Sequence, residues 1–151
     1  MLTFKHLLPK ERLLWWKFLE HKKGEYLKFD YDIRLGRGIT ELNHIPPELW
    51  NMARALSKKR VDIIGYKEEA IDLIEVKVRA GLGAVGQLLA YLYFYKAQFK
   101  PSLPIHLLIV TDFLDEDTRS VCRIYGIRVT QIRIDWDAYH KDPVSREWIP
   151  K

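Results

Sequence analysis

The first periodic stretch of the chain has apolar side chains at the spacing of a helix surface. Pro9 suits the first turn of a helix and Gly24 ends the pattern, so residues 9–23 are predicted to be helical. One face of this helix gathers four large apolar residues, Leu14, Trp15, Phe18 and Leu19. Glu11 projects from the same face one turn earlier, so the sequence places a carboxylate where an apolar side chain is expected.

The remaining periodic segments predict a chain of alternating strands and helices. Branched and aromatic residues in alternating runs predict strands over 26–35, 61–66, 71–78, 105–111 and 127–134. Helical spacing predicts helices over 48–56, 87–99 and 115–125. The helix over 87–99 is apolar almost all round, so we expect it to be well buried. The tail from Asp135 has no clear period.

Charged residues converge in the two strands at the centre of the chain. The short connection 67–70 between these strands forces an antiparallel hairpin. Pairing outward from this loop places Asp62 directly opposite Glu75, and Lys77 shares the face of Glu75 because side chains alternate along a strand. Two carboxylates and an ammonium group are therefore predicted to meet on a face that is apolar nearer the loop.

This group of side chains has two interpretations. Two carboxylates in contact repel each other unless a cation lies between them, and oxygen ligands of this kind suit Mg²⁺ or Mn²⁺. The ammonium group of Lys77 is then placed to orient or stabilise a metal-activated water that attacks a phosphodiester. The alternative is a solvated cluster of charges across two strands, although the apolar flanks of both strands argue against a solvated face.

A family resemblance supports the first interpretation. Asp62, followed by Glu75-Val76-Lys77 and by Gln87-Leu88-Leu89-Ala90-Tyr91, resembles the PD-(D/E)xK nuclease superfamily, in the QxxxY branch typified by RecB-type exonucleases. The short acidic motif is degenerate by itself. Its position in a hairpin and the QxxxY pattern that follows make the resemblance specific.

The resemblance implies a fold as well as a site. It implies an α/β, restriction-endonuclease-like fold with an αβββαβ core and helices on both faces of a central mixed β-sheet. The predicted order of elements agrees with this core if the helix over 48–56 is an insertion. We expect residues 1–151 to form one such domain, with the core at about 9–134 and a C-terminal tail at 135–151.

The resemblance also implies roles for five residues. Asp62 and Glu75 would be ligands of Mg²⁺ or Mn²⁺, and Lys77 would act on the attacking water. Gln87 and Tyr91 lie four positions apart on one side of a helix, which lets them face the site together and contact the nucleic-acid backbone. The other interpretation of Tyr91 is an ordinary core residue in an aromatic-rich helix.

Glu11 is the candidate for a further acidic residue of the site. Members of the superfamily commonly add a carboxylate from the first helix, and Glu11 fits that position as a third metal ligand. Its alternative role is a first-turn carboxylate that the helix dipole favours. Because burial of an unpaired carboxylate is costly, its place on the apolar face favours a metal, a partner charge or a capping bond.

Residues 81–86 spell a GxGxxG pattern, which is typical of dinucleotide-binding folds. We reject that interpretation because the preceding strand belongs to a hairpin and carries Glu75 and Lys77, and because too few residues follow. The acidic residue expected further on is also missing, since Asp112 lies too far along the chain. We expect the glycines to leave amides free beside Arg79, where a phosphate can approach.

Basic residues bracket the predicted site in the sequence. The formal net charge of +5 is compatible with nucleic-acid binding and with many other functions. The basic residues near the site are Lys58, Lys59, Arg60 and Arg79. They are predicted to form a phosphate-binding rim, and the alternative is an ordinary solvated run of charge.

Composition excludes several other classes of protein. The single cysteine, Cys122, excludes an internal disulfide, an all-cysteine zinc site and a cysteine-held iron–sulfur cluster. The longest apolar run, residues 88–95, is too short to span a membrane, and the N-terminus has no signal-peptide core. We therefore expect a cytoplasmic protein with no membrane partner.

The sequence supports one leading hypothesis and keeps its rivals open. The leading hypothesis is a metal-dependent nuclease with DNA as its partner, and a Holliday-junction resolvase-like endonuclease is a variant of it. The rivals are a non-catalytic DNA-binding protein that kept the nuclease fold, and a purely structural or interaction protein. A homodimer fits the nuclease hypotheses because double-strand cutting and junction resolution both need two sites, but no residue demonstrates it.

Overall fold

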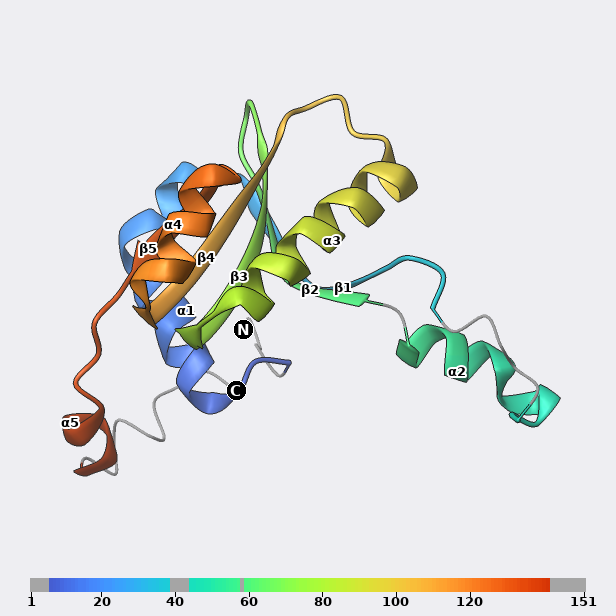
Figure 1. The fold of residues 1–151 in the computed structure, drawn as a ribbon, viewed down its shortest axis with the longest axis horizontal. Helices are drawn as coiled ribbons and strands as arrows, with labels where there is room; N and C mark the ends of the chain where they lie inside the picture. The colour runs from blue at the N-terminus through green and yellow to red at the C-terminus, as the bar shows by residue number, and fades with distance from the viewer. Residues whose placement is uncertain (1–5, 39–43, 58, 142–151) are drawn as a thin grey trace.

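The computed structural model describes residues 6–38, 44–57 and 59–141, with the backbone alone for 55–57 and 59. Five strands form one sheet in the order β1-β2-β3-β4-β5 (Figure 1). The strands are β1 (Lys28–Leu35), β2 (Lys59–Tyr66), β3 (Ile71–Ala80), β4 (Ile105–Leu114) and β5 (Ile127–Gln131). The helices are α1 (Pro9–Lys22), α2 (Trp50–Ser57), α3 (Leu82–Phe99), α4 (Glu116–Ile124) and α5 (Trp136–Lys141), with short 3-10 turns η1 (Lys23–Glu25) and η2 (Pro47–Leu49).

The strand directions make the sheet mixed. β1 pairs antiparallel with β2, and β2 pairs antiparallel with β3 across the predicted turn at 67–70. β4 and β5 run parallel to β3, and the helices α3 and α4 form the crossovers that parallel neighbours require. The predicted α/β class, the mixed sheet and the αβββαβ order are confirmed, with α2 inserted between β1 and β2.

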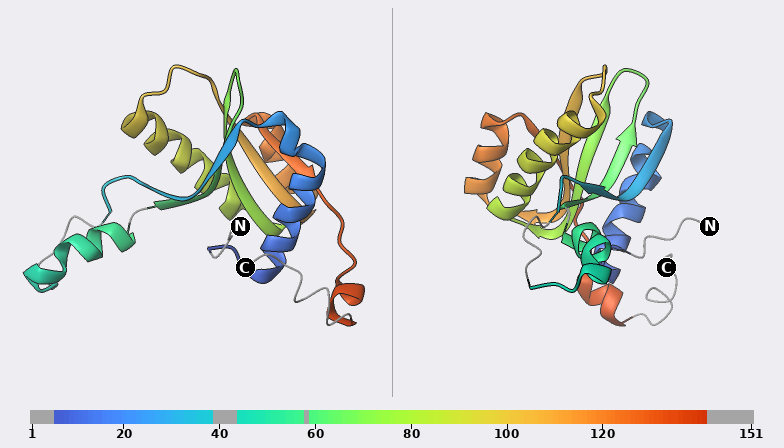
Figure 2. Two further views of the ribbon diagram at one scale, coloured as in Figure 1. Left: turned by 180° about the vertical axis from the view of Figure 1, so that it is seen from behind. Right: turned by 90° about the vertical axis from the view of Figure 1, so that its right-hand side faces the viewer.

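Helices cover both faces of the sheet (Figure 2). α1 packs on one face, in a group that we call the α1 layer, which includes Leu14, Trp15, Phe18, Ile63, Ile74 and Val76. α3 and α4 pack on the other face, in the α3 layer, which includes Val61, Ile64, Leu73, Leu88, Tyr91 and Cys122. The predicted apolar face of the first helix is therefore one of the two halves of the core.

The alternation of side chains along β1 changes at Asp32. Phe29 and Tyr31 pack in the α1 layer, whereas Ile33 and Leu35 pack in the α3 layer. In a regular strand all four residues would share one face. Asp32 lies between the two pairs with φ at 54°, in the left-handed region that Asn and Asp tolerate better than other residues with side chains. The backbone conformation of Asp32 therefore exchanges the side chains of β1 that face each helical layer.

β2 turns over at the opposite residue. Tyr31 pairs with Ile63 and Ile33 pairs with Val61, so the register is the same on both sides, but the ladder skips the pair between them, Asp32 and Asp62. Ile63 packs in the α1 layer and Val61 in the α3 layer. Both strands thus switch faces together, which their sequence patterns did not predict.

α3 begins earlier and is less buried than the sequence predicted. It begins at Leu82 after the N-cap Gly81, so Gly83 and Gly86 lie inside the helix and not in a loop before it. Tyr93 and Phe99 are exposed, because the described part of the chain covers only one side of the helix. Neither α3 nor any other described helix is long and apolar enough to cross a membrane.

The C-terminal region contains a helix that the sequence did not predict. α5 follows β5 and is tied back to the body by Trp136, whose indole N–H donates to the carboxylate of Asp112. The ammonium nitrogen of Lys10 lies 5.2 Å from the centroid of the Trp136 ring. Such a short helix has too few residues to show a period, and these contacts with β4 and α1 place it.

α2 stands away from the sheet. With η2 it forms a projection at one end of the molecule, while α5 lies at the other end, and the body arches between them (Figure 1). Leu49 and Met52 expose their apolar side chains on this projection. The amphipathic pattern of residues 48–56 therefore does not mark a helix that packs on the sheet.

We expect Gly65→Ala to destabilise the fold by about 1–3 kcal/mol, the usual cost of overpacking. A Cβ atom at Gly65 would lie 2.5 Å from the Tyr26 ring and 3.2 Å from that of Phe29. Tyr26 cannot move aside easily, because its hydroxyl donates to the buried Asp72 at 2.6 Å. Urea unfolding of both proteins measures the difference.

Gly83→Ala is the matched control for this experiment. A Cβ atom at Gly83 meets no atom within 4 Å, and alanine favours helix more than glycine does. Gly83→Ala should therefore leave the unfolding midpoint unchanged or raise it. Equal destabilisation by the two substitutions would contradict the packing argument.

Candidate functional site

Asp62 lies where β2 turns over and its ladder with β3 ends. That ladder has the predicted register and its last pair is Ile63–Ile74, so Asp62 and Glu75 occupy the next opposing positions. The carboxylate of Asp62 accepts a hydrogen bond of 3.2 Å from the backbone N–H of Val76. This bond holds the carboxylate of Asp62 against β3, beside Glu75.

Glu75 is almost fully buried, with 2% of its surface exposed. Burial, together with the negative charge of Asp62 and a hydrogen bond to it, raises the pKa of Glu75 to about 9. At neutral pH the carboxyl group of Glu75 therefore keeps its proton when no cation is present. The Oε2 atom of Glu75 is buried and has no hydrogen-bond partner among the described residues.

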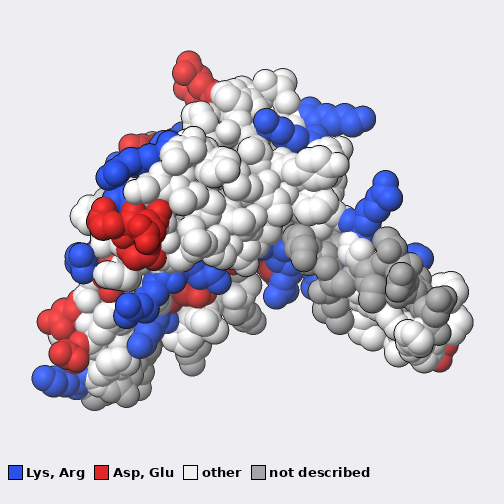
Figure 3. All heavy atoms as spheres, in the orientation of Figure 1, with Lys and Arg blue, Asp and Glu red and all other residues white. Residues whose placement is uncertain are grey.

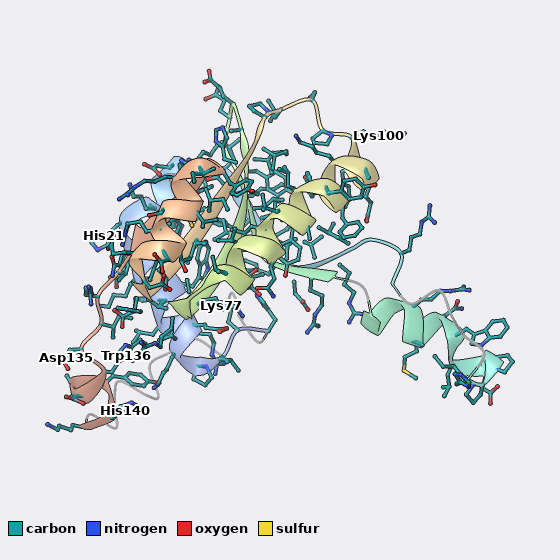
Figure 4. The ribbon with its side chains drawn as sticks, viewed as in Figure 1. His21, Lys77, Lys100, Asp135, Trp136 and His140 are labelled. Atoms are coloured by element: carbon teal, nitrogen blue, oxygen red, sulfur yellow. The ribbon has the colours of Figure 1, made fainter. Side chains whose placement is uncertain are left out.

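Lys77 lies beside the two carboxylates, two residues after Glu75 on β3. Its Nζ atom lies 3.8 Å from Oε1 of Glu75, and its side chain is partly exposed. The positive charge of Lys77 lowers the pKa of Glu75, but less than burial raises it. Figure 4 shows Lys77 at the end of β3, beside the first turns of α1 and α3. The structure thus brings together Asp62, Glu75 and Lys77 as the hairpin pattern predicted.

Glu11 approaches this group from α1. It is buried on the apolar face as predicted, and its Oε1 atom accepts a hydrogen bond of 3.2 Å from the backbone N–H of Leu8. Burial raises the pKa of Glu11, the charge of Asp62 adds to that rise, and the capping bond and the charge of Lys77 oppose it. Glu11 is therefore both a helix-capping group and a neighbour of the site.

The carboxylates do not form a preassembled metal cage. Within the described ranges, no three side chains of His, Cys, Asp or Glu gather closely enough to hold a metal ion. Asp62 and Glu75 associate directly, whereas Glu11 interacts with them only through their charges. The role of Glu11 as a third metal ligand stays a prediction.

α3 contributes Tyr91 to the site, and Gln87 lies one turn earlier on the same helix. Tyr91 is 5% exposed, and burial, followed by the charges of Glu75 and Asp62, raises the pKa of its hydroxyl. Gln87, one turn earlier on α3, is exposed. The two residues share a side of the helix, with Tyr91 beside the carboxylates and the side chain of Gln87 exposed, so the predicted role of Gln87 stays a prediction.

Only two of the four residues of the predicted basic rim have described side chains. Arg60 is exposed, and its positive charge lowers the pKa of Tyr91, so it lies near the site. Arg79 is exposed and packs over the ring of Phe113, with 4.7 Å between its guanidinium carbon and the ring centroid. Lys58 and the side chain of Lys59 lie outside the described residues.

Asp32 is a neighbour of the site that sequence reasoning missed. Its Oδ1 atom lies 3.4 Å from Nε of Arg60, and its backbone turns β1 over opposite Asp62. The sequence feature that could have identified Asp32 is an aspartate within an aromatic-rich strand, opposite Asp62 once the two strands are paired. That signal is weak, because alternating polar residues are normal in a half-exposed strand.

The chain matches no protein-family model and no curated protein. Two solved structures are similar to it in part. One is the crystal structure of a repair endonuclease from Pyrococcus abyssi, with 18% identity and a TM-score of 0.48, over 78% of this chain and 44% of that chain. The other is a complex of EndoMS with double-stranded DNA, with 16% identity and a TM-score of 0.49, over 88% of this chain and 46% of that chain. This chain spans less than half the length of either protein.

We expect Glu75→Gln to stabilise the metal-free protein more and more as the pH rises. The pKa of Glu75 is raised from 4.5 to about 9, so between these values the folded wild type keeps a proton that the unfolded chain has released. Wild-type stability therefore falls with rising pH, and the glutamine variant escapes this loss. The difference should grow by roughly 4 kcal/mol between about pH 4.5 and about pH 7.5.

Urea unfolding in EDTA over this pH range measures the difference. Glu69→Gln, in the exposed turn between β2 and β3, is the control and should leave the pH dependence of stability unchanged. Parallel stability curves for wild type and Glu75→Gln would show that Glu75 carries no such proton.

Proposed function

We propose that this chain is a metal-dependent nuclease of the PD-(D/E)xK type that hydrolyses phosphodiester bonds of DNA. The observation that carries the proposal is the buried pair of Asp62 and Glu75 with Lys77 beside it. The order of helices and strands that the resemblance implies, and the place of Tyr91 against this pair, add support.

The two carboxylates fit a hard divalent cation. Oε2 of Glu75 is buried without a hydrogen-bond partner among the described residues, and Glu75 holds a proton where a cation would otherwise balance its charge. Mg²⁺ is usually held by one or two carboxylates, with waters and substrate phosphates as the other ligands. Asp62 and Glu75 would hold Mg²⁺ or Mn²⁺, with Glu11 as an additional ligand. The bound ion would supply an activated water and a Lewis acid.

The chain's own side chains then have separate tasks. Lys77 is partly exposed and lies 3.8 Å from Glu75, so its ammonium group can orient the attacking water and stabilise negative charge on the phosphate. Tyr91 covers the pair of Asp62 and Glu75 from the α3 side and excludes water from it. Gln87 is exposed one turn away, in a position to contact the backbone of a bound strand.

A non-catalytic DNA-binding protein is the second candidate function. It is favoured by the absence, within the described residues, of three side chains already gathered around a metal. A junction-resolving endonuclease that acts as a homodimer is a variant of the nuclease proposal and differs from it in substrate. Both alternatives are separate outcomes of the cleavage experiment.

We expect Lys77→Ala to lower the rate of DNA cleavage by about 100-fold or more, the usual effect of removing a group that stabilises transition-state charge. Labelled single-stranded, duplex and four-way-junction DNA are incubated with Mg²⁺ or Mn²⁺, and products are separated on gels. RNA of the same sequence tests the class of nucleic acid.

Lys96→Ala is the control for the lost positive charge, because Lys96 is exposed in the last turn of α3. It should cut at the wild-type rate. Equal cleavage by wild type and Lys77→Ala would refute the assigned role. DNA binding without metal-dependent cleavage by the wild type would favour the non-catalytic alternative.

We also expect Mn²⁺ to bind more tightly as the pH rises toward about 9, since the ion must displace the proton on Glu75. Titration calorimetry in two buffers with different ionisation enthalpies counts the released protons, and about one is expected near neutral pH. Asp62→Asn should weaken binding strongly, whereas Asp117→Asn, on the exposed side of α4, should not. A pH-independent affinity would argue against a metal at this pair.

A further inference from the structure

Two arginines face each other beside the carboxylate pair. Arg34 on β1 and Arg60 on β2 are direct cross-strand partners, so their side chains leave the sheet on the same face. Like charges in directly opposite positions destabilise a pair of strands. Asp32 balances one of them, at 3.4 Å from Nε of Arg60, whereas Arg34 forms no ion pair with any described residue. Among the described residues, this arrangement leaves the positive charge of Arg34 without a balancing carboxylate.

The face switch at Asp32 decides where the two arginines point. Because Ile33 and Val61 pack in the α3 layer, the residues next to them on each strand, Arg34 and Arg60, point away from that layer. Without the switch, the two arginines would turn into the α3 layer, where burial of their charge would be costly. The left-handed backbone of Asp32 therefore keeps both arginines out of that layer, with Arg60 exposed and Arg34 partly exposed.

The arginine pair lies next to the proposed cleavage site. Arg60 is two residues from Asp62 on β2, a separation of roughly 7 Å along the strand, which is comparable to the spacing of successive phosphates in a nucleic-acid strand. Basic side chains, with some acidic ones among them, also lie along the edge of the body between the two projections, α2 and α5 (Figure 3). A phosphodiester at Asp62 therefore has its neighbouring phosphate within reach of Arg60.

We propose that Arg34 and Arg60 together bind a backbone phosphate of the nucleic-acid strand next to the phosphodiester held at Asp62 and Glu75, and that Asp32 is the positioning residue for Arg60. This inference rests on the proposed function and adds a binding site to it. A guanidinium group binds phosphate through paired N–H donors. Asp32 approaches Arg60 at Nε, which leaves the donors at its far edge for the phosphate.

The first test measures DNA binding in EDTA, where no cleavage occurs. Fluorescence anisotropy of a labelled duplex and a labelled single strand is recorded over a series of KCl concentrations. Arg34→Ala and Arg60→Ala should each weaken binding about tenfold and lower the salt dependence by about one released counterion. Arg123→Ala, exposed on α4, is the matched control and should bind like the wild type. Wild-type affinity and salt dependence in both site variants would overturn the phosphate site.

The second test separates the carboxylate of Asp32 from its backbone. Asp32→Gly keeps a residue that adopts the left-handed conformation freely but removes the carboxylate, and Asp32→Asn removes only the charge. Both variants should unfold at nearly the wild-type urea concentration and lose the contribution that Arg60 makes to the salt dependence. Adding Arg60→Ala to Asp32→Gly should then weaken binding little further. A full additional loss would show that Asp32 does not position Arg60.

Cleavage by the wild type in Mg²⁺ distinguishes this inference from the proposed function. If the wild type cuts DNA and the arginine variants bind and cut equally well, the arginine pair is refuted and the nuclease stands. If binding depends on both arginines and nothing is cut, the phosphate site stands and the nuclease is refuted. A wild type that binds no nucleic acid refutes both.

Discussion

The structure is organised around two carboxyl groups that share a site from which water is largely excluded. Asp62 and Glu75 meet at the end of the β2–β3 ladder, and Glu75 is almost completely buried. In such surroundings two negative charges cannot persist side by side, so the pair must hold a proton or a cation. The pKa of Glu75, raised to about 9, corresponds to the state with a bound proton. The proposed metal ion would give the state with a bound cation.

A second buried carboxylate on the same strand illustrates the difference between a structural and a functional charge. Asp72 is fully buried, but Lys67 and Arg128 approach its carboxylate at 3.3 Å and 3.0 Å, and the hydroxyl of Tyr26 donates to it. These partners join the hairpin turn, the segment before β1, and β5 around β3. Glu75 has only Lys77 as a cationic partner in the described ion pairs, at 3.8 Å, and one of its oxygens has no hydrogen bond there. Oδ1 of Asp72 also lacks a hydrogen-bond partner among the described residues, but the guanidinium group of Arg128 lies against it. The fold thus surrounds one charge with cations and leaves the other open to a ligand.

The position of the pair depends on the break in the outer strands. At Asp32 and Asp62 the ladder of β1 and β2 is interrupted, and both strands exchange the faces that they present to the two helical layers. The interruption frees the carboxylate of Asp62 from an ordinary place in the sheet and lets it bind the amide of Val76. It also directs Arg60 toward solvent, so one local backbone conformation shapes both the acidic and the basic parts of the site.

The sequence by itself determined the order of the elements, the hairpin register and the meeting of Asp62 with Glu75. These follow from local periods and from a short turn, which leave only one pairing that keeps apolar residues inside. Tertiary structure alone decided the exchange of faces at Asp32, the burial of Tyr91 against the carboxylates, and the attachment of α5 through Trp136. Each of these depends on contacts between residues far apart in the chain, and a local pattern of polar and apolar positions carries no record of such contacts.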